Sequence, residues 1–296
     1  MQFRTLLTAI RPPFLILTPV CVFLGTSTAI AAQESIDSLA LILVMIGALC
    51  AHISVNTLNE HADFKSGLDL ITIRTPFSGG SGALPGEPAM ASMVLMTGVI
   101  TLIVTMAIGV YFVNSYSGLI LPIGIIGILI IVTYTRWINR WPLACLIAPG
   151  VGFGILMVVG THIILTGENT ITPWLAALVP FFLVNNLLLL NQFPDVEPDK
   201  SMGRYHFPIA YGVKASSYAY GAMSLSACAV ILLGVVYGYF PTLSLIALLP
   251  LLLTLFSLSG AFRHAENIGQ YPQYLGANVA ATLLTPLLLA ISITYG

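Results

Sequence analysis

Two short polar stretches stand out in an otherwise apolar chain, because each pairs an asparagine with an aspartate four residues later. The first contains Asn59 and Asp63, and the second contains Asn191 and Asp195. Residues four apart lie one above the other on a helix, so we expect both side chains of a pair to point the same way. Ionised carboxylates near hydrocarbon are costly, and such clusters therefore need a function.

A further acid follows each pair, Asp69 in the first stretch and Asp199 in the second. If the two stretches face one another across a cavity, their carboxylates repel strongly at low dielectric constant. Bound divalent cations would relieve the repulsion, and magnesium typically takes one or two carboxylates together with substrate phosphates. The candidate metal-contacting residues are Asn59, Asp63, Asp69, Asn191, Asp195 and Asp199.

Basic residues in the same region favour a phosphate ligand. The candidates are Lys65, Arg74, Lys200 and Arg204, together with Arg140 from another loop. Such side chains hold phosphate oxygens through charged hydrogen bonds, and metal ions stabilise diphosphate as a leaving group. In so apolar a chain, the predicted substrate is a diphosphate with a membrane-soluble tail, a polyprenyl diphosphate.

Departure of diphosphate from an allylic carbon leaves a carbocation, which an aromatic face stabilises. Tyr134 is the best-placed aromatic candidate, although a tyrosine at the end of an apolar run is also typical of interfacial anchoring. Tyr134 completes a predicted catalytic set with Asp63, Asp195 and Asp199. Water must be excluded from such a site, because it quenches the cation.

The composition indicates an integral membrane protein. Hydrophobic residues make up 57% of the chain, charged residues only 7%, and the mean hydropathy is +0.97, whereas soluble domains are about one quarter charged. The four cysteines form no C-x-x-C pair, so we interpret them as small core residues. The net charge of −1 and the absence of a basic patch argue against a nucleic acid partner.

The apolar runs are long enough to cross the hydrocarbon core as helices. We expect an all-α membrane protein forming one domain over residues 1–296, with about nine transmembrane helices around a central cavity capped by cytoplasmic loops. The predicted spans are 12–32, 39–62, 89–113, 117–138, 142–166, 172–193, 214–238, 242–262 and 272–294.

The distribution of charge supports this count. With nine spans, all 10 basic residues fall in the N-terminal segment or in the loops after spans two, four, six and eight. The opposite side carries only the acids Glu34, Asp37 and Glu168. By the positive-inside rule, the basic side is cytoplasmic. We therefore expect a multi-pass protein of the bacterial cytoplasmic membrane, with its N-terminus inside and its C-terminus on the opposite side.

Both acidic stretches then lie on the cytoplasmic face, and each opens a long polar loop, 63–88 or 194–213. The first loop includes Gly79, Gly80 and Gly82, which exclude a regular helix there. These glycines either supply backbone N–H groups to an anion or simply make turns.

On these motifs, the sequence resembles the UbiA superfamily of intramembrane prenyltransferases over essentially its whole length. The stretch Asn59-Glu60-x-x-Asp63 is similar to the opening motif of that family. The second motif corresponds to Asn191-x-x-x-Asp195-x-x-x-Asp199, followed by Gly203-Arg204 and Pro208. The resemblance implies that these motifs bind magnesium and a prenyl diphosphate, and that an aromatic acceptor is alkylated.

The departures from the family pattern concern the acceptor. Glu60 stands where Asp is usual, and Gly67 stands where ubiquinone-pathway members often have a third Asp, which Asp69 could replace. The Gly67-x-Asp69 spacing resembles the menaquinone-pathway branch, whose acceptor is dihydroxynaphthoate. The segment 134–141 is not a close match to either branch.

Two other classes of function stay open on the sequence. A membrane terpene cyclase, or transfer to a non-aromatic acceptor, would use the same ionisation chemistry. A cation-coupled transporter would also need acids, but these should lie near the bilayer midplane on broken helices. Here they lie at the ends of spans, which favours the prenyltransferase.

Overall fold

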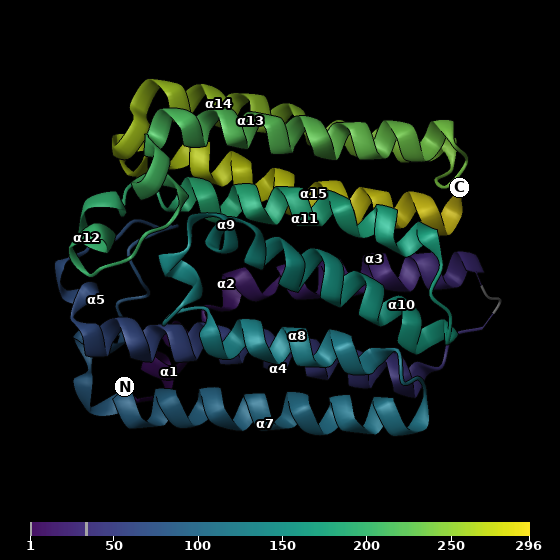
Figure 1. The fold of residues 1–296 in the computed structure, drawn as a ribbon, viewed down its shortest axis with the longest axis horizontal. Helices are drawn as coiled ribbons and strands as arrows, with labels where there is room; N and C mark the ends of the chain where they lie inside the picture. Colours follow the sequence, from purple (N-terminus) through teal and green to yellow (C-terminus); the bar gives the residue numbers. More distant parts are fainter. Residues whose placement is uncertain (1, 33–34) are drawn as a thin grey trace.

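The computed structural model describes residues 2–32 and 35–296. The described residues are helical with connecting loops and contain no strand, and Figure 1 shows the long helices running side by side. The long helices are α3 (Leu17–Ala32), α4 (Ser38–Ser66), α7 (Ala91–Ser115), α8 (Ile120–Thr133), α11 (Ile171–Asn191), α13 (Phe207–Val236), α14 (Leu252–His264) and α15 (Pro272–Tyr295). A further long helix consists of α9 (Pro142–Gly150), the π-helical segment η3 (Val151–Met157) and α10 (Val158–Thr166).

Short helical segments connect or extend these elements. At the N-terminus they are α1 (Gln2–Ile10) and α2 (Pro12–Leu15). The others are α5 (Leu68–Ile71), α6 (Ala83–Gly86), η1 (Pro88–Met90), η2 (Ile138–Arg140), α12 (Val196–Ser201), η4 (Thr242–Leu248) and η5 (Ala265–Gln270).

The predicted all-helical membrane fold is confirmed. Within the described residues, eight helical stretches are long and apolar enough to cross a membrane, and α8 is a shorter apolar helix of 14 residues. The span predicted over 117–138 extends too far, because its helix ends at Thr133. The span predicted over 242–262 begins at Thr242 as predicted, although its first part is the 3₁₀ segment η4.

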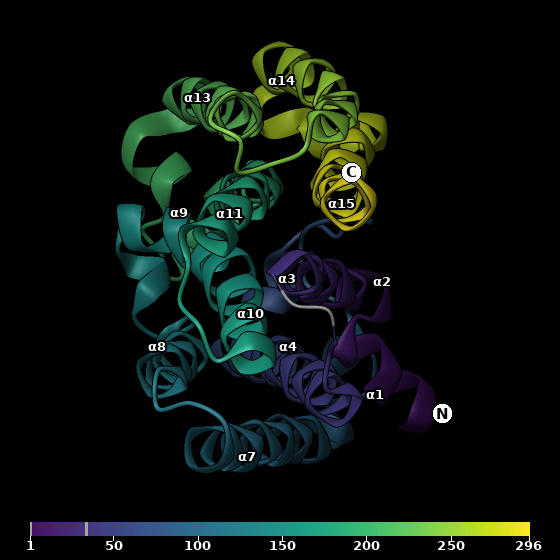
Figure 2. The ribbon, with the colours of Figure 1, turned by 90° about the vertical axis from the view of Figure 1, so that its right-hand side faces the viewer.

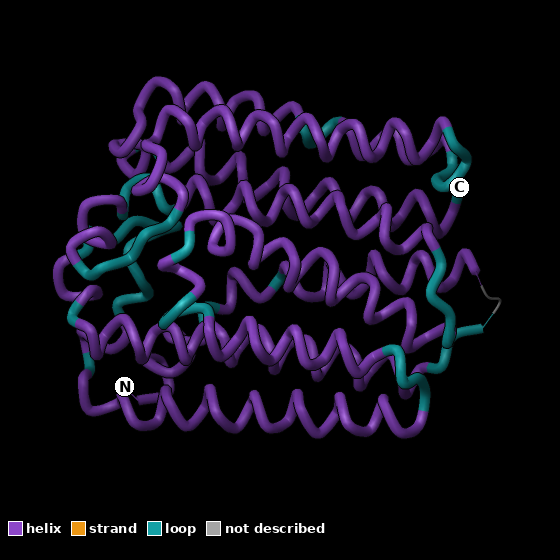
Figure 3. Tube along the Cα trace, in the orientation of Figure 1, coloured by secondary structure: helices purple, strands orange, loops and turns teal. Residues whose placement is uncertain are grey.

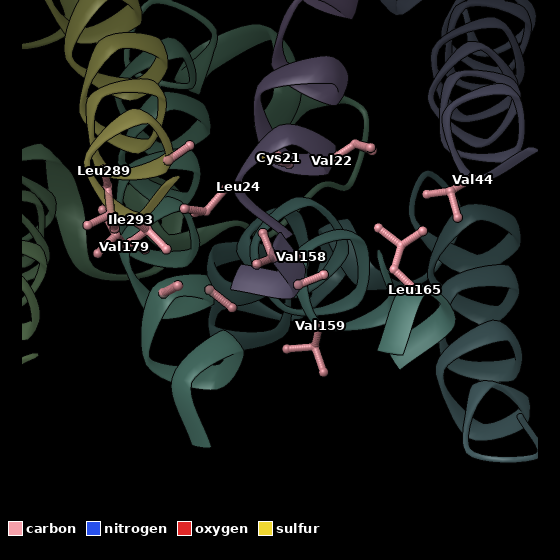
Figure 4. Close-up of a cluster of buried hydrophobic side chains, with 14 of the residues drawn as sticks. Cys21, Val22, Leu24, Val44, Val158, Val159, Leu165, Val179, Leu289 and Ile293 are labelled. Atoms are coloured by element: carbon pink, nitrogen blue, oxygen red, sulfur yellow. The ribbon is translucent and has the colours of Figure 1, made fainter. Parts of the chain in front are cut away.

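The helices form two outer groups with a central group between them. In Figure 2, which looks along the helices, α4, α7 and α8 lie on one side and α13, α14 and α15 on the other. The helices α3, α10 and α11 lie between these groups, and α3 packs against both α10 and α15. Figure 4 shows part of the interior that results, a cluster of buried side chains that includes Leu24 of α3, Val158 of α10 and Leu289 of α15.

Small residues set the closest helix contacts. A Cβ atom at Gly25 of α3 would lie 2.5 Å from the carbonyl oxygen of Val158 in α10. A Cβ atom at Gly154 in η3 would lie 2.5 Å from the backbone nitrogen of Phe181 in α11. Lipid tails are as apolar as the side chains, so close backbone packing is a main source of helix association in a membrane.

The long helix that contains η3 is irregular at Pro149. Proline has no N–H group and its ring clashes with the preceding turn, so a proline inside a helix disturbs the hydrogen-bond ladder. Directly after it, the backbone N–H of Gly150 donates to Oδ1 of the buried Asn185 in α11, at 2.6 Å. A side chain of the neighbouring helix thus replaces a bond of the regular ladder, which is how an irregular backbone is tolerated at membrane depth.

The loops gather at the two ends of the bundle (Figure 3), and the chain termini lie at opposite ends. Segments 67–90 and 192–206, which include α5 and α12, share the end where the N-terminus lies, and we call this the motif end. The predicted placement of both acidic stretches at one end is therefore confirmed. Glu34, which the charge pattern assigned to the opposite side, lies outside the described residues.

We predict that Gly154→Ala destabilises the protein by about 1–3 kcal/mol, because the added methyl group must separate η3 from the α11 backbone. The matched control is Gly152→Ala, since a Cβ atom there meets none of the described atoms within 4 Å. Thermal unfolding of both variants in detergent measures the difference. Equal melting temperatures for the two variants would contradict the close contact.

Candidate active site

A cavity with a volume of about 1020 Å³ lies inside the bundle and reaches the loops of the motif end. Its wall there is polar and includes Asp63, Asp195, Asp199 and Arg204. Deeper in the bundle the wall becomes apolar, with side chains such as Ile131 of α8. The cavity therefore joins a charged mouth to a hydrophobic interior.

The first motif lies on the last turns of α4, where Gly67 ends the helix with φ 85°. Asn59 and Asp63 lie on one face, as predicted, and the Asn59 Nδ2 donates to Asp63 Oδ2 at 2.6 Å. Both residues line the cavity, with Asp63 buried. The amide therefore holds the carboxylate at the cavity mouth.

The second motif does not lie on a single helix face, contrary to the prediction from its spacing. Helix α11 ends at Asn191, a turn that contains Pro194 follows, and Asp195 stands at the N-cap of the short α12. Proline disfavours helical backbone at the residue before it, which explains the break. Asn191, Asp195 and Asp199 still all line the cavity, because the turn folds back over its mouth.

Arg204 joins the two motifs. Its guanidinium pairs with Asp63 of α4 through Nη2 and with Asp199 of α12 through Nη1, the latter at 3.1 Å. The His206 Nε2 lies 3.0 Å from the other oxygen of Asp199. The attraction of both carboxylates raises the pKa of Arg204 further above its usual value, although its burial works against this. Asp63 and Asp199 are thus already paired within the protein.

Asp195 is only partly paired. Its Oδ2 accepts a hydrogen bond from the backbone N–H of Gly79 at 3.0 Å, whereas its buried Oδ1 has no partner among the described residues. Burial, followed by the negative charge of Asp199, raises the pKa of Asp195 to about 7. One loop glycine therefore does supply an N–H group to an anion, but the anion is a carboxylate of the protein.

Two acids of the first stretch lie behind the cavity wall. Asp69 is buried beneath Gly80, where a Cβ atom would lie 2.5 Å from its Oδ1. Burial, and then the charges of Glu60 and Asp63, raise the pKa of Asp69 to about 7. Glu60 is fully buried and pairs with Arg11 at 2.9 Å. Asp69 therefore does not line the cavity with the other predicted metal-contacting residues.

Of the five predicted phosphate-binding residues, the structure places only Arg204 in the cavity wall. The others, Lys65, Arg74, Lys200 and Arg140, lie outside it. The Arg74 guanidinium lies beside Gly82 instead. Arg4 and Arg11 from the N-terminal segment line the cavity, although neither was in the predicted phosphate-binding set. The Pro12-Pro13 pair, which forces a corner directly after Arg11, was the available signal.

Tyr134, the predicted cation-stabilising aromatic, lines the cavity in the turn after α8. Cys145 of α9 and Gln192 also line the cavity, and Nε2 of Gln192 donates to the Cys145 sulfur at 3.4 Å. Tyr134, Cys145 and Gln192 thus form one part of the cavity wall.

The oxygens at the mouth fit a magnesium ion that completes its shell from a substrate. Among the described residues, no three His, Cys, Asp or Glu side chains come together as a ready-made metal cluster. However, Oδ1 of Asn191 and Oδ1 of Asp195 are both buried without a partner. Buried polar atoms are normally paired, so two such oxygens in one cavity wall indicate a ligand. Magnesium usually needs only one or two carboxylates when phosphates complete its shell.

Together, the fold and the site define a multi-pass membrane protein in which carboxylates and an arginine close the polar mouth of an apolar cavity. The chain belongs to the UbiA prenyltransferase family, whose model matches residues 18–271. It is therefore a prenyltransferase-family membrane enzyme.

Two curated relatives share moderate similarity with the chain. Both are 1,4-dihydroxy-2-naphthoate octaprenyltransferases, from Bacillus subtilis at 28% identity over 212 residues and from Haemophilus influenzae at 25% over 211 residues. The matches cover 70% and 68% of this chain. The chain spans 65% of the length of the B. subtilis protein and 67% of the H. influenzae protein.

Solved structures share the fold. A UbiA homolog from Aeropyrum pernix K1 superposes with a TM-score of 0.74 at 16% identity, covering 95% of this chain and 98% of the other. A UbiA homolog from Archaeoglobus fulgidus bound to DMAPP and Mg²⁺ gives a TM-score of 0.69 at 14% identity, covering 98% and 99%. The helical architecture is thus retained at low sequence identity.

We predict that magnesium binding weakens as the pH falls below about 7. The raised pKa means that Asp195 is mostly protonated below that pH, and a protonated carboxylate must lose its proton to bind a cation. Below pH 7 the affinity should fall by up to about tenfold per pH unit for each such carboxylate. Titration calorimetry with magnesium between pH 5.5 and 8.5, at roughly half-unit steps, measures this. A magnesium affinity that does not change with pH in the wild type would contradict this prediction. The same pH dependence of the affinity in Asp195→Asn as in the wild type would also contradict it.

Proposed function

We propose that the protein transfers a polyprenyl group from an allylic diphosphate to a small aromatic acceptor in a magnesium-dependent reaction. One observation carries the proposal: the partly paired Asp195 lies with the Arg204-paired Asp63 and Asp199 at the polar mouth of an otherwise apolar cavity of about 1020 Å³. A charged head group fits the mouth, and an isoprenoid chain fits the apolar interior. The A. fulgidus homolog, with DMAPP and Mg²⁺ bound, supports this choice of substrate.

Under this proposal Asn191 and Asp195 hold magnesium through their unpartnered oxygens, with Asn59, Asp63 and Asp199 completing the predicted set. The bound ion supplies positive charge that stabilises the leaving diphosphate. Arg204, placed between the motifs, binds the diphosphate oxygens in the planar geometry that a guanidinium offers. Asp69 lies behind Gly80 and outside the cavity wall, so we leave it out of the proposed metal-binding set.

The prenyl carbon that loses diphosphate must meet the acceptor without meeting water. The 75–81 loop forms part of the cavity wall and is bound to Asp195 through Gly79, so it covers the mouth from one side. Tyr134 offers an aromatic face along the wall of the cavity, where it stabilises positive charge on the allylic group. A carbon of the acceptor ring then bonds to the allylic carbon, whose bond to the diphosphate oxygen has broken. The ring regains its aromaticity when that ring carbon loses a proton or loses its carboxylate as CO₂.

We infer that the acceptor is a bicyclic aromatic acid of the dihydroxynaphthoate type. Support comes from the names of the B. subtilis and H. influenzae relatives, and from the Gly67-x-Asp69 spacing. For the cellular setting we propose one domain in a bacterial cytoplasmic membrane with the motif end inside. The basic segments of the chain lie at that end, in line with the positive-inside rule.

We predict that Asp195→Asn lowers the rate of prenyl transfer by about 100-fold or more, because it removes charge that holds the metal and diphosphate. The matched control is Glu197→Gln, two residues later, since Glu197 is exposed and lies outside the cavity wall. The measurement uses purified protein, magnesium, radiolabelled prenyl diphosphate and candidate acceptors.

The same assay separates the proposed function from its rivals. Wild-type protein that releases no diphosphate with any acceptor, with or without magnesium, would refute the proposal. A cyclic hydrocarbon formed without an acceptor would replace it with a terpene cyclase. Ion flux in liposomes that Asp195→Asn abolishes, without prenyl chemistry, would point to a transporter.

A further inference from the structure

Arg11 and Glu60 form a second ionic cluster at the motif end, separate from the Arg204 pairings. The Arg11 Nη2 lies 2.9 Å from Glu60 Oε2. The Glu60 side chain is fully buried, whereas that of Arg11 is 27% exposed. Arg11 lines the cavity, and Glu60 lies behind the wall. Glu60 is therefore placed to hold Arg11 rather than to contact a ligand itself.

The Glu60 carboxylate binds two segments at once. Besides Arg11, it accepts hydrogen bonds from Ser81 Oγ at 2.6 Å and from the Ser81 backbone N–H at 3.3 Å. One turn earlier on α4, Asn56 Nδ2 donates to the carbonyl oxygen of Ile10 at 3.0 Å. The corner at Arg11 is thus fixed to α4 through the Ile10 carbonyl and through the Arg11 side chain, and the glycine-rich loop is fixed to the same Glu60 carboxylate.

The backbone of Arg11 is strained. Its φ of 59° and ψ of 61° lie in the left-handed region, which non-glycine residues rarely adopt, and Pro12 follows directly. Such a conformation persists only where the surrounding contacts determine it, and it is concentrated at ligand sites. The contacts of Asn56 with Ile10 and of Glu60 with Arg11 stabilise this conformation, and they keep the Arg11 side chain in the cavity wall.

The Arg11 guanidinium also has hydrogen-bond donors besides the one that Glu60 engages. A guanidinium carries five N–H donors in a fixed fork, and Glu60 engages Nη2. Nε of Arg11 is buried and has no partner among the described residues. Arg204, in contrast, lies between two carboxylates. A buried donor without a partner, on a charged group in a cavity wall, indicates an oxyanion that binds there.

We propose that Arg11 binds a substrate oxyanion at the cavity mouth and that Glu60 is the residue that positions it. The oxyanion is either the carboxylate of an aromatic acid acceptor or the diphosphate of the prenyl donor, since both offer paired oxygens to a guanidinium. The choice of these two ligands rests on the proposed function. The anion site itself rests on the geometry of Arg11.

Binding to purified full-length protein with magnesium tests this proposal by titration calorimetry. The probes are inorganic diphosphate, 1,4-dihydroxy-2-naphthoate, and 1,4-dihydroxynaphthalene, which lacks the carboxylate. Arg11→Gly removes the side chain and suits the left-handed backbone, but it leaves the buried Glu60 without its positive partner, so we expect a lower melting temperature than in the wild type. Binding of the neutral diol then serves as the check that the variant is folded. We expect this variant to bind one of the two anions about tenfold more weakly or worse, and to bind the neutral diol as before.

The role of Glu60 is tested by a double-mutant cycle. Glu60→Gln should weaken binding of the same anion, and Glu60→Asp, which keeps the charge, should restore part of it. The double variant Arg11→Gly/Glu60→Gln should bind the anion no more weakly than Arg11→Gly alone, because Glu60 acts through Arg11. Fully additive losses would show that Glu60 acts by another route and would overturn its positioning role.

The two sources of the oxyanion give different results. Weaker naphthoate binding with unchanged diphosphate binding assigns Arg11 to the acceptor, and the reverse assigns it to the donor. The charge control is Arg263→Gln, an exposed residue at the end of α14 outside the cavity. Unchanged affinity for both anions in Arg11→Gly, or an equal loss in Arg263→Gln, would overturn the proposal. If anion binding depends on Arg11 but the wild-type protein shows no prenyl transfer, the proposed function is refuted and the anion site at Arg11 stands.

Discussion

The structure depends on how charge is buried at one end of an apolar bundle. Arg204 lies 141 residues after Asp63 in the chain, yet its guanidinium pairs with that carboxylate and with Asp199. Isolated ions at this depth would be costly, and breaking a buried pair by removing one partner typically costs about 3–5 kcal/mol. The pairing therefore fixes the end of α4 against the turn that follows α11, and it brings the two halves of the site together.

The remaining acids at the motif end follow from this constraint. Glu60 obtains its positive partner from Arg11 in the N-terminal segment, and Asp195 obtains a backbone N–H group from Gly79. Asp69 receives less compensation, and its raised pKa reflects this. The glycine-rich loop is thus bound at two points, through Gly79 and Ser81, to carboxylates of different motifs. A loop held in this way covers the cavity mouth without having a hydrophobic core of its own.

The apolar part of the fold serves the same site by leaving a cavity of about 1020 Å³ inside the bundle. Helices approach closely where glycine allows it, as at Gly25 and Gly154, and this tight packing on one side stabilises the helices that line the open space on the other. The similarity to solved UbiA homologs at 14–16% identity agrees with this view. Packing of this kind requires small residues at a few contacts and tolerates many apolar sequences elsewhere.

The sequence alone determined the membrane class, the approximate helix count and the placement of both motifs at one end of the bundle, because these follow from hydropathy, span length and the parity of the spans. It also determined that Asn59 and Asp63 share a helix face, since that pair is local. Tertiary structure decided the rest. Pro194 placed Asp195 on a turn rather than on α11. Among the predicted phosphate-binding residues, only Arg204 lines the cavity and contacts both motifs in the described structure. Whether a charged side chain faces a cavity or lies behind its wall depends on partners distant in the chain, and local spacing carries no information about those partners.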